Sequence, residues 1–138
     1  MHWGRGAILV TVLFLSGCLA DPQRVQSATL FDRLSEAHAA FVAARQSEGC
    51  NTVGDVQTRL VGEPGLANGE STYRSLRAAA QALQAVCGQT TVLEQAISET
   101  AASRAARDRW QTGIQRELGI ACDYLGAAAA DLGRAAPC

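Results

Sequence analysis

Few residues of this chain have the types and spacing that catalysis requires. Of its two histidines, only His38 lies beyond the apolar N-terminal segment. It falls on the apolar side of a predicted helix, between Leu34 and Phe41, where a histidine is usually packed at the edge of a core. A catalytic triad or dyad would have to use this one imidazole. We therefore predict no catalytic residue, and a small enzyme that uses His38 stays as the third hypothesis for the function.

Metal and cofactor motifs are equally scarce in the sequence. Asp32 and Glu36 lie four residues apart and could hold a cation on one helix face, but Arg33 beside them is typical of a solvated charged surface. No C-x-x-C or C-x-x-C-H motif occurs. The glycine-rich segment 62–69 lacks the lysine of a phosphate-binding loop. We expect no metal ion and no cofactor.

A run of arginines, Arg104, Arg107 and Arg109, precedes Trp110. Guanidinium groups form paired hydrogen bonds with phosphate and carboxylate, so this run could bind an anionic group. A charged run on a helix is more often a solvated face, and we favour that interpretation. The whole chain has 12 Arg and no Lys against 13 acidic residues, a formal net charge of −1, so we expect no nucleic-acid partner.

The N-terminus has the pattern of an export signal. An uncharged apolar run over residues 7–15 is too short to span a bilayer but fits the hydrophobic part of a signal peptide. Leu15-Ser16-Gly17-Cys18 follows and resembles the lipobox of bacterial lipoproteins. The resemblance covers 18 residues only. It implies a signal peptide over 1–17 and a single domain over 18–138.

The same resemblance implies that Cys18 carries the lipid and becomes the first residue of the mature chain. The anchor would place the protein on the non-cytoplasmic side of the cell membrane or the outer membrane. Leu19 after the acylated cysteine is similar to the pattern of lipoproteins released to the outer membrane. The alternatives are a secreted protein cut near Ala20 and an uncleaved anchor.

The other four cysteines, Cys50, Cys87, Cys122 and Cys138, form an even and widely spaced set. In an exported chain this pattern predicts two disulfides rather than a zinc site. Three pairings are possible. We favour Cys50–Cys87 with Cys122–Cys138, because short loops close most easily. Cys50–Cys122 with Cys87–Cys138 is a close second.

The composition predicts an all-α fold. The chain of 138 residues contains 26 Ala and three Pro, and aromatic residues make only 5 % of it, which favours helices over a β-sandwich. We predict a small up-and-down helical bundle of three or four main helices plus one short helix, braced by disulfides. The predicted helices cover 22–47, 53–61, 70–87 and 91–133, with a loop over 62–69. We expect Gly49 to end the first of them.

The extent of the last helix is open. Thr91-Val-Leu-Glu94 forms a capping box that predicts a helix start, as Thr52 and Asp55 do for the short helix. A helix over 91–133 would overhang its neighbours, so we favour a break near Thr112-Gly113. The alternative is a three-helix bundle, in which the 53–61 and 70–87 helices lie end to end along one long helix.

Apolar residues at helical spacing predict the core. The stripes contain Phe31, Leu34, His38, Phe41 and Ala44, then Tyr73, Leu76, Ala80, Leu83 and Cys87, then Trp110, Ile114, Leu118, Cys122, Leu125 and Leu132. A Leu-Gly pair recurs every seven residues from Leu118 to Gly133. We interpret this repeat as tight packing inside the bundle rather than a dimerisation face.

These observations predict a membrane-anchored cell-envelope lipoprotein that acts by non-enzymatic binding or scaffolding. An envelope protein is the candidate partner beside the membrane itself. The alternative function is a carrier of a small apolar ligand, held in a pocket between helices with the 62–69 loop as a lid. The target and the oligomeric state do not follow from the sequence.

Overall fold

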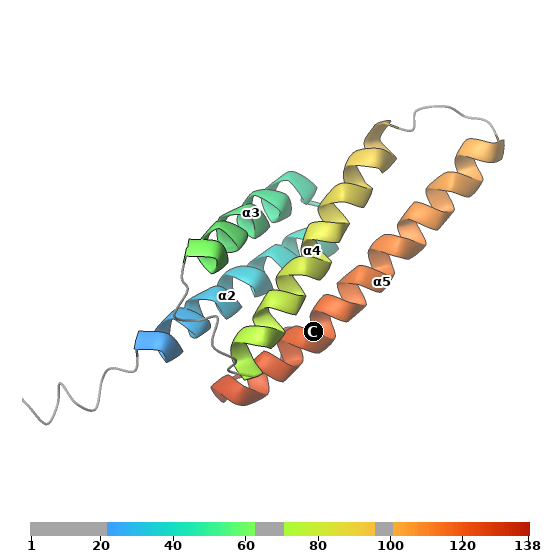
Figure 1. Ribbon diagram of the computed structural model, residues 1–138. Coiled ribbons are helices and arrows are strands. Elements are labelled where there is room, and N and C mark those ends of the chain that lie inside the picture. The colour runs from blue at the N-terminus through green and yellow to red at the C-terminus, as the bar shows by residue number, and fades with distance from the viewer. Residues whose placement is uncertain (1–21, 63–70, 96–100) are drawn as a thin grey trace, which may run out of the picture.

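The computed structural model describes residues 22–62, 71–95 and 101–138, and the regular structure in this part of the chain is α-helical. The helices are α2 (Pro22–Val42), α3 (Gln46–Gly62), α4 (Ser71–Gln95) and α5 (Ala101–Leu132). Consecutive helices run in opposite directions (Figure 1). The all-α, disulfide-braced, up-and-down bundle predicted from the sequence is therefore confirmed.

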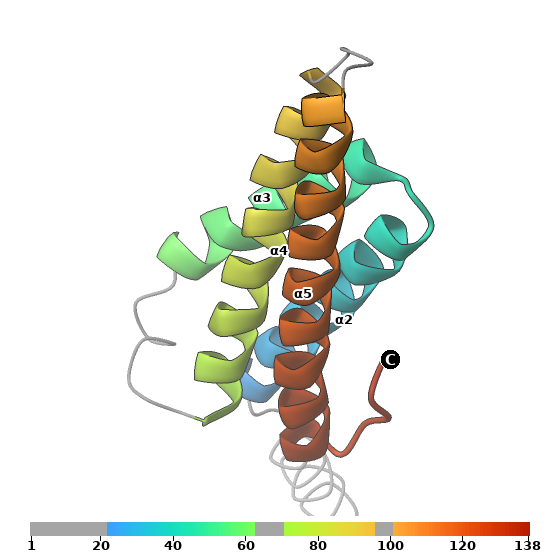
Figure 2. The same cartoon turned by 90° about the vertical axis from the view of Figure 1, so that its right-hand side faces the viewer.

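Helices α4 and α5 form a long hairpin that extends beyond the shorter pair α2 and α3 (Figures 1 and 2). The 32 residues of α5 span about 48 Å at 1.5 Å per residue, whereas the 17 residues of α3 span about 25 Å. The end of α4 and the beginning of α5 lie at the opposite end of the molecule from the start of α2 (Figures 1 and 2). The bundle is thus four-helical at one end and two-helical at the other.

The core lies in the four-helical part, where α2 packs against each of the other three helices. The largest fully buried side chains come from all four helices and are Leu34, Val53, Val56, Leu76, Leu83, Val86 and Leu125. The stripes predicted for α2 and α4 are buried, except for Ala44. In the stripe predicted for α5, Leu118 and Leu125 are buried, while the other members are half-buried: Trp110, Ile114, Cys122 and Leu132.

Polar contacts join the helices where α4 begins and α5 ends. The Tyr73 hydroxyl donates to the Leu60 carbonyl oxygen over 3.1 Å, which ties α4 to α3. The Thr72 hydroxyl donates to the Asp131 carboxylate over 3.2 Å, and Arg134 pairs with Asp32 of α2. These contacts connect the four helices at this end of the bundle.

The predicted first helix, 22–47, is too long, because α2 ends at Val42. Ala44 has a positive φ of 59°, the Ala44 N–H donates to Phe41 O, and the Arg45 N–H donates to Ala40 O. This is the Schellman ending that usually carries glycine, and α5 ends in the same way at Gly133, whose φ is 67°. With alanine at the left-handed position, the sequence contains no signal for the stop.

The predicted short helix, 53–61, is also wrong in extent, because α3 begins at Gln46. Gly49 and Thr52 both lie inside α3, so the Thr52–Asp55 pattern is not a capping box. Gly49 is buried beneath Phe41: a Cβ at Gly49 would lie 2.9 Å from the Phe41 ring. A glycine that seemed to end one helix instead allows the next helix to pack closely.

Helix α4 continues past the predicted end at 87, through Gly88 and Thr91, to Gln95. Thr91 therefore does not begin a helix. The predicted break near Thr112-Gly113 is wrong too, because α5 runs without interruption from Ala101 to Leu132. The end-to-end alternative also fails, because α3 and α4 are antiparallel neighbours. The predicted 62–69 loop lies outside the described residues apart from Gly62.

The Leu-Gly repeat divides between the two sides of α5. Leu118 and Leu125 are buried in the core. A Cβ added to Gly119, Gly126 or Gly133 would meet no atom within 4 Å. The close packing that we predicted at these glycines is therefore absent from the described structure, and the leucines alone explain the heptad spacing.

Candidate functional site

Two disulfides occupy the four cysteines outside the N-terminal segment. Cys50 bonds to Cys87 and joins α3 to α4, with the two Cα atoms 5.6 Å apart. Cys122 bonds to Cys138 and joins α5 to the tail that follows it, with a Cα–Cα distance of 6.0 Å. This is the consecutive pairing. None of the four thiols is free to act as a nucleophile or a metal ligand.

His38 lies in the interface between α2 and α5 and is 7 % exposed. Its Nε2 atom is 3.2 Å from the backbone oxygen of Leu118. A carbonyl oxygen only accepts hydrogen bonds, so this contact requires the tautomer with hydrogen on Nε2. The imidazole thus links two helices at the edge of the core, and it does not face an open cleft.

The carboxylates near the start of the bundle pair with different arginines. Asp32 pairs with Arg134, while Arg33 lies 3.7 Å from Glu36 and 3.3 Å from Asp55. These side chains are 38–68 % exposed, so the pairs contribute little stability each. No set of three or more metal-ligating side chains gathers anywhere in the described ranges. Asp32 and Glu36 form a solvated charged surface.

A groove of about 740 Å³ lies between the turn after α2 and the first half of α5. Five of its ten lining residues are apolar and five are polar: Phe41, Val42, Ala44, Ile114 and Leu118, with Gln46, Asp108, Gln111, Thr112 and Gln115. The carrier hypothesis places an apolar pocket under the 62–69 loop. Residues 63–69 lie outside the described part of the chain, so that pocket stays a prediction.

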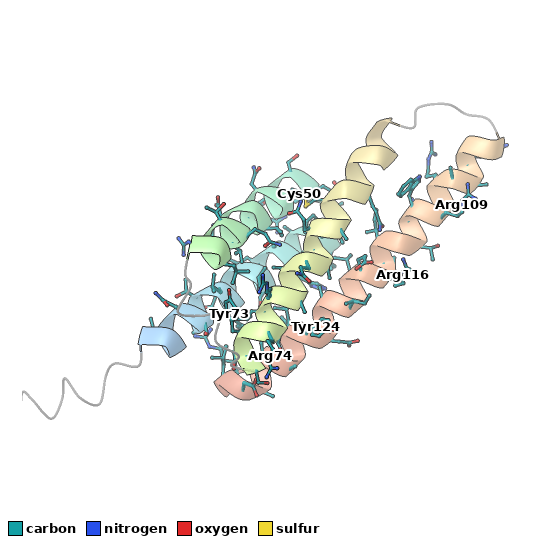
Figure 3. All side chains as sticks on the ribbon, viewed as in Figure 1. Cys50, Tyr73, Arg74, Arg109, Arg116 and Tyr124 are labelled. Atoms are coloured by element: carbon teal, nitrogen blue, oxygen red, sulfur yellow. A yellow bond between two sulfur atoms is a disulfide. The ribbon has the colours of Figure 1, made fainter. Side chains whose placement is uncertain are left out.

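A second pocket, of about 360 Å³, lies between α4 and α5 on the projecting half of the hairpin. Its lining residues are Gln89 of α4 and Arg109, Trp110, Gly113 and Arg116 of α5; we call it the hairpin pocket. Figure 3 shows Arg109 and Arg116 one after the other along α5. The structure thus brings Arg109 and Trp110 of the predicted arginine run together with Arg116, while Arg104 and Arg107 do not line the pocket.

The backbone at Gly113 shapes the hairpin pocket. Residues 109, 113 and 116 lie on one face of α5 because they are four and three positions apart. A Cβ at Gly113 would lie 2.7 Å from the Gln89 Oε1 atom. The Gln89 amide therefore packs on α5 only because residue 113 is glycine. Gly113 makes room for the end of the Gln89 side chain, and it does not break the helix.

Polar side chains of the hairpin pocket lack hydrogen-bond or ion-pair partners among the described residues. Gln89 Oε1 is buried and accepts no hydrogen bond. Neither Arg109 nor Arg116 is in an ion pair with any residue that the structure describes, whereas Arg33, Arg45 and Arg134 are. Unpaired guanidinium groups beside an indole make the surface here suited to an anion.

The α5 side of this half of the hairpin carries a net positive charge. Residues 104–117 of α5 contain four arginines and two acidic residues, Asp108 and Glu117, and the second half of α4 adds one acidic residue, Glu94. The spacing of Arg109, Gly113 and Arg116 could have been noticed in the sequence. Gln89 could not, because only the register of α4 against α5 brings it to this face.

No helix in the described ranges combines the length and the hydropathy that crossing a membrane requires. Compared with protein-family models, with curated proteins and with solved structures, the chain matches none of them.

Proposed function

We propose that the protein is a lipid-anchored lipoprotein of the bacterial cell envelope that acts as a non-enzymatic binding module. The observation that carries this proposal is the lipobox-like sequence ending at Cys18, four residues before α2 begins at Pro22. Four extended residues reach at most about 14 Å. A lipid on Cys18 would therefore hold the bundle close to the membrane surface.

The lipid would have to supply the membrane affinity. Removal of residues 1–17 leaves 11 Arg and 13 acidic residues, a formal charge of −2, so the net charge of the mature chain gives no attraction to an anionic membrane surface. Each buried acyl CH₂ contributes about 0.8 kcal/mol, and two or three chains are enough for durable attachment. Acylation of Cys18 would thus supply the membrane affinity of the proposed anchor.

The shape of the bundle supports a binding role. The α4–α5 hairpin projects from the end opposite the start of α2 (Figure 1). With the anchor next to α2, the hairpin would extend away from the membrane to which the protein is attached. Its basic surface would then be presented to other envelope components.

The anchor is tested by Cys18→Ser, with Ser16→Ala as the matched control because it keeps a small residue at the lipobox and leaves the thiol in place. In a bacterial host fed labelled palmitate, the wild type and S16A should carry the label and start at residue 18. C18S should carry no label and should retain residues 1–17. Label on C18S, or a wild-type N-terminus at another residue, would contradict the lipoprotein proposal.

A further inference from the structure

We infer that the hairpin pocket of Gln89, Arg109, Trp110, Gly113 and Arg116 binds a phosphate group. This inference deepens the proposed binding role and rests on the hairpin being the binding surface. It does not depend on the lipid at Cys18. The ligand class follows from the donors that line the pocket, from the position of the nearby acidic residues, and from the space above Gly113.

The pocket is lined by hydrogen-bond donors. Arg109 and Arg116 each carry five N–H groups and no acceptor, and the Trp110 indole nitrogen can only donate. Gln89 has one acceptor, Oε1, but that atom is buried and faces Gly113. The Gln89 amide nitrogen is a further donor on a side chain that lines the pocket. An occupant of this pocket must therefore supply acceptors.

No nearby carboxylate lines the pocket. Asp108 is the acidic residue closest in sequence to Arg109, but it lines the groove on the other side of α5. Glu117 follows Arg116 and does not line the hairpin pocket. Both arginine side chains are exposed beside the half-buried Trp110, so the positive charge of the two guanidinium groups is accessible to an external anion.

Several donors from two helices suit a tetrahedral anion better than a carboxylate. One arginine can already satisfy both oxygens of a carboxylate. A phosphate has three or four oxygens, and it can accept from Arg109, Arg116 and the Gln89 amide at once. The indole of Trp110 offers an apolar surface to the organic part of a phosphate ester. A soluble ester and a lipid headgroup share this phosphate chemistry.

Trp110 is the single tryptophan of residues 18–138, so tryptophan fluorescence reports on the hairpin pocket. The test uses the full chain with Trp3→Phe, kept in a neutral detergent, which leaves Trp110 as the only tryptophan. Phenyl phosphate is titrated at constant ionic strength, with benzoate as the carboxylate comparison. We expect a saturable change in Trp110 emission with phenyl phosphate and binding at least about tenfold weaker with benzoate.

Arg109→Gln and Arg116→Gln should each weaken phenyl phosphate binding about tenfold, because each removes a charge-assisted hydrogen bond. Gly113→Ala should weaken it as well, because the new Cβ displaces the Gln89 amide. The matched control is Arg104→Gln, which removes the same charge from α5 outside the pocket and should bind as the parent does. Circular dichroism melting curves identify any variant that fails to fold.

A second titration tests whether the phosphate belongs to a lipid headgroup or to a soluble ester. It uses dihexanoyl phosphatidylglycerol, a short-chain lipid, below its micelle concentration. Binding of this lipid that is lost in R109Q assigns the pocket to headgroups, whereas binding of phenyl phosphate alone assigns it to soluble esters; both results support the site. The inference is overturned if neither compound gives a saturable signal, if benzoate binds equally well, or if R109Q and R116Q bind as R104Q does. In those cases labelling of Cys18 is unaffected, so the two proposals fail separately.

Discussion

At the scale of single residues, two glycines of α3 have opposite environments. A Cβ at Gly49 would lie 2.9 Å from the Phe41 ring, whereas a Cβ at Gly54 would meet no atom within 4 Å. Phe41 is buried in the core and has little room to move aside. Substitution of each glycine by alanine therefore distinguishes the effect of packing on stability from the effect of helix propensity.

We expect Gly54→Ala to stabilise the bundle by about 0.5–1 kcal/mol, because alanine loses less backbone entropy in a helix. Gly49→Ala gains the same term but overpacks the core at a cost of about 1–3 kcal/mol, so a net loss should result. Urea unfolding of the two variants measures both values. If G49A proved as stable as G54A, the close packing of α3 on Phe41 would be refuted.

At the scale of elements, the two disulfides differ in what they connect. Cys50–Cys87 closes a separation of 37 residues between two packed helices, and Cys87 is part of the core. Cys122–Cys138 closes only 16 residues and holds an exposed tail against α5. The first disulfide should therefore contribute more to the stability of the bundle.

In the chain-entropy model the longer loop contributes about 4 kcal/mol and the shorter about 3 kcal/mol. We expect the C50A/C87A double variant to lose more free energy of unfolding than C122A/C138A, as measured by urea unfolding. The pairing itself is checked by a non-reduced digest after arginine, which should link peptide 46–59 to 78–104 and peptide 117–134 to 135–138. A link from 46–59 to 117–134, or a smaller loss for C50A/C87A, would contradict this assignment.

At the scale of the whole molecule, packing is uneven along the α4–α5 hairpin. From residue 104 to 117 no side chain of α5 is fully buried, whereas Leu118, Ala121, Leu125, Ala128 and Ala129 are. The hairpin extends past the ends of α2 and α3, so its outer half packs mainly as α4 against α5, with the turn after α2 alongside it only across a groove (Figure 2). Local opening should need less free energy there than in the four-helical part.

Hydrogen exchange followed by mass spectrometry should therefore show faster exchange for amides of residues 104–112 than for those of 118–129. The backbone amides of α2 and α3 around the Arg33–Asp55 pair should exchange as slowly as those of the core. Equal protection along the whole of α5 would mean that another surface covers the outer half, and it would contradict a hairpin that projects freely into solvent.

The sequence by itself determined the fold class and most of the core. Alanine-rich composition and apolar residues at helical spacing depend only on local chemistry, and they correctly placed Leu34, Leu76, Leu83 and Leu125 in the interior. The helix boundaries were predicted less well. Alanine at position 44 adopts the left-handed conformation that glycine usually takes, so no residue type marked the end of α2.

Only the tertiary structure decided what the internal glycines and the arginines do. Gly49 and Gly113 looked like helix breakers, but contacts with Phe41 and Gln89 explain both of them. Packing free energy outweighs the roughly 1 kcal/mol that glycine costs inside a helix, and it acts between residues far apart in the chain. For the same reason, Gln89 lies beside Arg109 and Arg116 only because α4 and α5 pack in this register. That register depends on contacts along both helices, and no single position in the sequence determines it.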